Sequence, residues 1–210
     1  MLFNGSFCQS VWLQKNHVPL PIQNQKGMWR DIFITIAQLI VASPAAWKDL
    51  EKEKRTQHEF LYRFLHPIFG IIAFTSFVGG LWFVREGNVE NALKSSIINV
   101  VGVYGGYFIA SYLLNEIAPR FGVSKDLPRF QQFTGYASVV LYALFIITPF
   151  LSELFILWLL ALYTIYLVNI GTLYFMKVPK AKVADFTAAA SAIIILSPVL
   201  IRTLFSYLIQ

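Results

Sequence analysis

Charged side chains are scarce in this sequence. Asp, Glu, Lys and Arg make up 13% of the 210 residues, whereas hydrophobic residues make up 57%. A soluble domain carries about a quarter charged residues, so a chain this apolar does not have enough polar side chains to cover its surface in water. The composition therefore excludes an ordinary soluble globular protein and indicates that lipid surrounds most of the chain.

Cysteine and the common catalytic signatures are also nearly absent. Cys8 is the one cysteine, so no disulfide can form within the chain. The three histidines do not have the spacing of metal ligands. The sequence contains no HExxH motif, no GxSxG motif and no phosphate-binding glycine loop. We therefore expect a protein that is not an enzyme and that uses no metal or cofactor.

What the sequence has instead is a series of long apolar runs. Five runs each hold about 20 residues, enough for a helix to cross about 30 Å of hydrocarbon. The third and fourth are separated only by Ser152 and Glu153, which predicts a tight hairpin. We predict an all-α, polytopic membrane helix bundle with five transmembrane helices. The predicted spans are residues 64–84, 96–118, 130–151, 153–175 and 186–209, within a transmembrane domain of residues 64–210.

The segment before the first span is predicted to be a short N-terminal arm. Residues 1–27 are polar and lack periodicity, so we expect either a disordered extension or a stretch upstream of a natural start at Met28. Residues 28–63 form the helical arm, and its first part has one apolar face at helical spacing. That face fits two interpretations, an amphipathic helix on the membrane surface or a helix packed on the cytosolic end of the bundle. The residues of the face are Ile32, Phe33, Ile36, Leu39 and Ile40.

Lysine and arginine are distributed unevenly between the two predicted sides of the membrane. Five precede the first span closely, and three lie in each of the connections after the second and fourth spans, which makes eleven on one side. The other side has three, with Arg202 included. Basic residues favour the cytoplasmic side. We therefore predict a cytoplasmic (inner) membrane protein with its N-terminus in the cytoplasm and its C-terminus outside.

Small residues recur at intervals of four in the second span. Gly102, Gly106 and Ala110 form one face where another helix can approach closely. We interpret this face as a helix-packing surface, of which self-association is a special case. Similar strips are Ala184, Ala188 and Ala192 in the fifth span, and Ser76 and Gly80 in the first.

Polar residues within spans are functional candidates because they are costly in lipid. Asn169 is the deepest and is interpreted as a hydrogen-bonding contact between helices, while Arg202 is expected near the outer face, paired with Glu153. The spans lack the spaced carboxylates of a proton relay and the matched broken helices of a repeat-built transporter. The intramembrane polar candidates are Asn115, Glu116, Asn169 and Arg202.

Three short segments match motifs of a known family. The matching residues are Ser43, Pro44 and Trp47 in IVASPAAWKDL, Pro67 in FLHPIFGIIAFTSFVGGLW, and Gly135 and Tyr136 in TGYASVVLYAL. Over about residues 28–209 the chain resembles the bacterial branch of the Yip family, five-span relatives of the eukaryotic Ypt/Rab-interacting membrane proteins. The resemblance implies five spans, a cytosolic N-terminus and a role in membrane organisation without catalysis. The acidic segment of the eukaryotic members has no counterpart here, which leaves GTPase binding without sequence support.

These observations favour a non-enzymatic scaffold or adaptor of the inner membrane. The lipid bilayer is the expected partner, with other membrane proteins or a second copy as open alternatives, and no nucleic acid. A small transporter or channel component is the rival function, and a polar, water-filled cavity through the bundle would favour it. A subunit of a larger membrane complex is the third hypothesis, and small-residue faces left uncovered on the isolated chain would favour that one.

Overall fold

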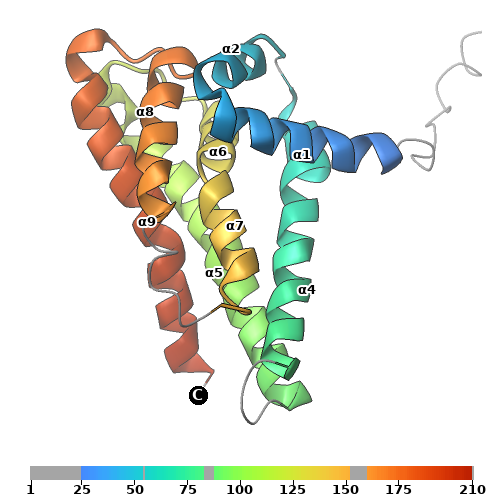
Figure 1. Cartoon of the computed structure of the whole chain (residues 1–210). Coiled ribbons are helices and arrows are strands. Elements are labelled where there is room, and N and C mark those ends of the chain that lie inside the picture. Colours follow the sequence, from blue (N-terminus) through green and yellow to red (C-terminus); the bar gives the residue numbers. More distant parts are fainter. Residues whose placement is uncertain (1–24, 54, 83–87, 152–159, 210) are drawn as a thin grey trace, which may run out of the picture.

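The structure, a computed structural model, describes residues 25–53, 55–82, 88–151 and 160–209. All regular elements in these residues are helices, most of them aligned side by side (Figure 1). The predicted all-α membrane helix bundle is therefore confirmed. The prediction for residues 1–27 lies almost wholly outside the described residues.

Within the part of the chain that the structure describes, three helices are long and apolar enough to cross a membrane. They correspond to the predicted first, second and fifth spans. Each extends beyond its predicted boundary at the end of the bundle where the N-terminal arm lies. The first joins α3 (Gln57–Phe60), a π-helical turn (Leu61–Leu65) and α4 (His66–Trp82); the second joins α5 (Val89–Ile117) and a 3₁₀ turn (Ala118–Phe121); the third joins a 3₁₀ turn (Lys180–Lys182) and α9 (Val183–Leu208).

The predicted third span is a bent pair of helices rather than one straight helix. The helix axis bends by 48° between α6 (Leu127–Ala137) and α7 (Val139–Ile147). Ser138 lies between the two helices, and its backbone dihedral angles fall outside the helical range. α7 ends at Ile147, two residues before Pro149, whose nitrogen has no N–H to continue the helical hydrogen bonds. Counted as one span, the pair brings the candidates in the described residues to four.

The predicted fourth span is only partly described. α8 (Tyr163–Tyr174) belongs to an apolar helix, Leu160–Tyr174, that is shorter than a full crossing. Residues 152–159, which include Glu153 and the predicted hairpin, lie outside the described residues. The count of five spans therefore stays a prediction.

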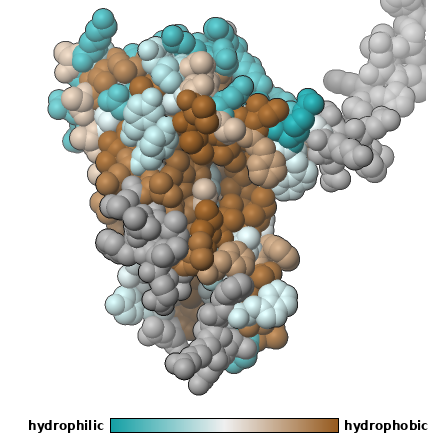
Figure 2. Space-filling view, viewed as in Figure 1, coloured by the Kyte–Doolittle hydropathy of each residue, from teal (hydrophilic) through white to brown (hydrophobic). Residues whose placement is uncertain are grey.

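α5 is the central helix of the bundle. It packs against α4, α6 and α9, and α8 packs on α9. Two further helices close one end: α1 (Gln25–Val41) runs across the spans, and α2 (Ser43–Glu53) follows it (Figure 1). We call this the arm end. Hydrophilic residues gather there, whereas hydrophobic residues cover much of the flank of the bundle (Figure 2).

The basic connections lie at the arm end too. The Lys177 ammonium lies 2.7 Å from the Glu51 carboxylate of α2, and Lys182 donates to the backbone carbonyl of Arg120 at 2.7 Å. These contacts join the arm to the connection between α8 and α9, and that connection to the one between α5 and α6. The three basic segments that the sequence assigns to one side of the membrane thus occupy one end of the molecule.

Candidate functional site

The arm is fastened to the bundle by Trp47. This side chain is fully buried, and its ring centroid lies 5.7 Å from that of Phe133 on α6 and 5.5 Å from that of Phe175 after α8. A Cβ at Gly171 would lie 2.8 Å from the Trp47 ring, so α8 needs glycine there. The sequence positions the tryptophan locally, because Ser43 and Pro44 start α2 and the buried residues of α2 recur at helical spacing.

A second contact joins the start of the first span to α6. The Phe60 ring occupies the space where a Cβ would stand at Gly135, so the two segments touch only because that residue is glycine. Tyr136 packs beside it, with ring centroids 4.9 Å from those of both Phe60 and Phe64. Offset and edge-on aromatic pairs of this kind add to the free energy of burial.

Polar side chains hold the connection between α2 and α3 to the same helix. Gln132 donates to the backbone carbonyl of Arg55 at 2.8 Å, and Gln57 donates to the side-chain carbonyl of Gln131. The Arg55 guanidinium donates to the Tyr136 hydroxyl at 3.4 Å. We call these five side chains the polar latch. Gln131 and Gln132 were not among the predicted candidates, and their signal is two adjacent amides at the start of an apolar run.

The motif residues thus fall into one connected region, with one exception. Trp47, Gly135 and Tyr136 meet through the aromatic rings at the arm end, and Ser43 and Pro44 set the start of the helix that carries Trp47. Pro67 lies apart at the beginning of α4, in the first turn after the π-helical segment. There its missing N–H fits the local break in the helical hydrogen-bond pattern.

α1 has two different apolar sides. Ile32 and Leu39 are buried against the bundle at 3% and 0% exposure, while Phe33 and Ile40 are exposed to 64% and 40%. The exposed polar residues Asp31 and Gln38 lie on the opposite side from Phe33 and Ile40, given 3.6 residues per turn. The predicted single face of α1 is therefore split between contact with the protein and free apolar surface.

A recess of about 670 Å³ lies between α1 and the start of the first span. Its charged lining includes both signs, and the guanidinium of Arg63 lies 3.3 Å from the Glu59 carboxylate. Within the described ranges, no group of three or more His, Cys, Asp or Glu side chains could hold a metal ion. The arm end therefore presents charged side chains of both signs, on helices that are packed against the bundle.

The six motif residues belong to a region that matches a known protein family. A model of the Yip1 domain matches residues 37–201, a range that contains all six motif residues. The chain belongs to the Yip1 domain family. The predicted family resemblance is thereby confirmed, whereas the bacterial branch stays a prediction. Comparisons with curated proteins and with solved structures gave no match.

Within this Yip1 domain, the glycines of α5 lie against α9. A Cβ at Gly106 would stand 2.6 Å from the backbone N and Cα of Pro198, and one at Gly102 would stand 2.9 Å from the Cβ of Arg202. Ala110 is 1% exposed on the same face. The partner Pro198 was not predicted, because a contact between two spans depends on how the helices cross.

The two other small-residue strips differ from each other. Gly80 packs closely on α5, since a Cβ there would lie 2.8 Å from the Cα of Ala92, and Ser76 accepts a hydrogen bond from Asn99 at 3.1 Å. The strip in the fifth span has no comparable contact. Its residues, Ala184, Ala188 and Ala192, are all exposed in the structure.

The intramembrane polar candidates do not converge on one site. Glu116 pairs with Lys125 at 2.5 Å near the arm end, while the side-chain oxygen of its buried neighbour Asn115 has no hydrogen-bond partner among the described residues. Asn169 donates to Thr187 on α9 at 3.5 Å, a contact between helices. Arg202 lies near the other end of α9, and its predicted partner Glu153 is outside the described residues.

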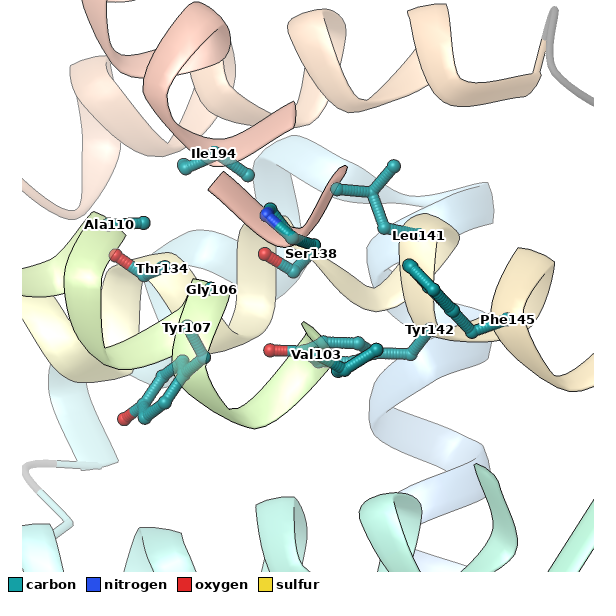
Figure 3. A pocket seen from close by; sticks show the side chains of 11 residues that line it. Val103, Gly106, Tyr107, Ala110, Thr134, Ser138, Leu141, Tyr142, Phe145 and Ile194 are labelled. Carbon is teal, nitrogen blue, oxygen red and sulfur yellow. The ribbon is translucent and has the colours of Figure 1, made fainter. Parts of the chain in front are cut away.

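Among the described residues, the place where α5, the α6–α7 bend and α9 meet is closely filled. Between α5, the α6–α7 bend and α9, a void of only about 10 Å³ is open to a water-sized sphere. Figure 3 shows the Tyr142 side chain reaching from α7 toward α5, while the Tyr107 hydroxyl points away from the void. Such a void holds at most about one water molecule.

Proposed function

We propose that this Yip1 domain protein is a non-enzymatic scaffold or adaptor of the cytoplasmic membrane, and that its arm end is the surface that binds a partner protein. The observation that carries the proposal is the contrast between the two parts of the molecule. The interior holds a void of about 10 Å³, whereas the arm end carries two extra helices fastened by Trp47 and the polar latch. A transporter needs a path through the bundle, and this void provides none.

The arm end faces the cytoplasm in this proposal, and α1 lies in the membrane surface. The basic asymmetry of eleven residues to three supports the orientation, and all three basic segments lie at the arm end. The position of α1 in the membrane surface is supported by its exposed residues: the side chains of Phe33 and Ile40 are 64% and 40% exposed, and Asp31 and Gln38 lie on the opposite side of the helix. A helix of this kind lies along the membrane with its apolar side in the lipid.

Cysteine labelling tests both points in one experiment. In a Cys8→Ser background, Gln38→Cys should react with a membrane-impermeant maleimide in inverted vesicles but not in intact cells. Phe33→Cys should react poorly from either side, because lipid covers it, and should become reactive once detergent removes the bilayer. Both side chains are exposed on the isolated protein, so each serves as the control for the other.

Two outcomes of the labelling would contradict the proposal. Reaction of Gln38→Cys in intact cells would reverse the orientation. Equal reactivity of both positions in inverted vesicles would show that α1 stands away from the bilayer.

Photo-crosslinking tests the adaptor function itself. A photoreactive residue at the exposed position 52 of α2 should form one discrete protein adduct in native membranes, and Asp49→Lys on the same exposed side should remove it. Exposed charge substitutions of this kind usually change stability by less than about 0.5 kcal/mol, so loss of the adduct would report loss of recognition. A photoreactive residue at position 208, exposed near the far end of α9, is the matched control.

An adduct that survives Asp49→Lys, or that forms equally from position 208, would contradict recognition by the arm. Solute-specific flux through proteoliposomes containing the purified protein would favour the transporter instead.

A further inference from the structure

A polar groove lies at the end of the bundle opposite the arm. It runs between α5 and α9, has a volume of about 640 Å³, and is bordered by Phe145 of α7. Two cationic side chains, Lys94 and Arg202, line it, and none of the described residues that line it is acidic. The other polar lining residues are Asn91, Ser95, Asn99, Thr203, Ser206 and Tyr207.

Arg202 is held at this groove by the crossing of α5 and α9. A Cβ at Gly102 would lie 2.9 Å from the Cβ of Arg202 and 3.3 Å from its Cα, so the arginine starts where the two helices are in close contact. Its side chain is exposed, and the described part of the chain provides it with no ion pair. An arginine in a span is costly unless it reaches an anion or the interface.

The second cation is only loosely engaged. The Lys94 ammonium lies 3.0 Å from the Glu90 carboxylate on the preceding turn of α5, and the two side chains are 44% and 73% exposed. An exposed pair of this kind contributes little, so the ammonium can turn toward an anion in the groove. Ser95 and Ser206 line the same groove with hydroxyl groups, which donate well to phosphate oxygens.

Depth and apolar surroundings distinguish a lipid from a soluble anion. Arg202 lies six residues before the end of α9 at Leu208, about 9 Å along the helix axis, which is a suitable depth for a headgroup. Beside the groove, α9 carries a leucine stripe formed by Leu196 and Leu200, which are 53% and 65% exposed. These leucines lie seven residues before Thr203 and Tyr207, which line the groove, and therefore share their sides of the helix.

We propose that this groove binds the headgroup of an anionic phospholipid. Arg202 and Lys94 contact the phosphate, the hydroxyl groups of the groove donate to its oxygens, and the acyl chains follow the leucine stripe of α9. Arginine is suited to this role because its planar guanidinium matches phosphate geometry. The site does not depend on the adaptor function proposed for the arm end.

Lipid retention by the full-length protein tests the proposal. In native mass spectrometry from detergent, the wild type should retain phosphatidylglycerol in preference to phosphatidylcholine. The double variant Lys94→Gln/Arg202→Gln should retain about tenfold less phosphatidylglycerol, because two charge-assisted contacts are lost. The control Arg120→Gln/Lys180→Gln removes the same net charge from exposed positions at the arm end and should retain the lipid as the wild type does.

Several results would overturn the assignment. An equal loss in the control variant would show general electrostatic attraction, and equal retention of phosphatidylcholine would show that the charge of the lipid is irrelevant. Thermal stabilisation by inorganic phosphate alone, as large as that by phosphatidylglycerol, would identify a soluble anion as the ligand.

A second variant keeps the test valid if the double variant does not fold. Ser206→Trp fills the groove and leaves both cations in place, so it should also reduce retention of phosphatidylglycerol. Unchanged retention in a folded Ser206→Trp protein would place the lipid elsewhere.

Discussion

Gly106→Leu is expected to destabilise the protein by about 1–3 kcal/mol or more, the usual range for overpacking a closely filled core. A Cβ at this position would lie 2.6 Å from the backbone N and Cα of Pro198. Backbone atoms cannot rotate away as a side chain can, so α9 must move away from α5. The measurement is the thermal stability of the purified protein in detergent, monitored by the loss of helical circular dichroism.

Gly70→Leu is the matched control for this substitution. Gly70 is also a glycine within an apolar helix, but it is exposed, and apart from the neighbouring backbone of its own helix no described heavy atom lies within 4 Å of a Cβ built there. Leucine is the better helix former by somewhat less than about 1 kcal/mol, so this variant should be as stable as the wild type or slightly more so. Equal stabilities of the two variants would show that the contact between α5 and α9 is not tight.

Trp47→Ala is expected to have the largest effect of any single substitution in the arm. The side chain is fully buried and contacts Phe133, Tyr136 and Phe175. Truncating a buried tryptophan to alanine costs about 3–5 kcal/mol. Since these contacts join α2 to α6 and the segment after α8, the variant should release the arm. Limited proteolysis should then cleave between residues 41 and 57 much faster than in the wild type.

Two substitutions separate the docking of the arm from the general loss of a tryptophan. Trp82 is 73% exposed at the end of α4, so Trp82→Ala should leave both the cleavage rate and the thermal stability nearly unchanged. Trp47→Phe should have an intermediate effect, because the indole N–H has no hydrogen-bond partner among the described residues and only packing is lost. Rapid cleavage in the Trp82→Ala protein, or slow cleavage in Trp47→Ala, would contradict the role of Trp47.

The fold class and the family could be predicted from the sequence because their signals are local. Composition and the length of apolar runs indicate membrane helices whatever the helices pack against, and the short segments around Trp47 and Tyr136 carry the family resemblance. The bend between α6 and α7 was not predicted. Its position depends on the backbone at Ser138, and the sequence does not distinguish this residue from other polar residues of the same predicted span, such as Gln132 and Thr134.

The candidate site was predictable only in part, for a similar reason. Tyr136 could be found from its motif, but its neighbours Phe60 and Gln132 come from segments that meet only in the folded bundle. The apolar face of α1 was identified, yet the sequence left open what it contacts. In the structure Leu39 faces protein and Phe33 does not, although both lie within the same periodic pattern.

The docking of Trp47 sets an order of events during synthesis. The ribosome makes α2 early, but the socket that receives Trp47 is built from Phe133, Gly171 and Phe175, which emerge much later. Contacts between residues this far apart in the chain form slowly, because the intervening loop must close first. The arm is therefore undocked while the first spans enter the bilayer. It docks only after α8 has taken its place in the bundle.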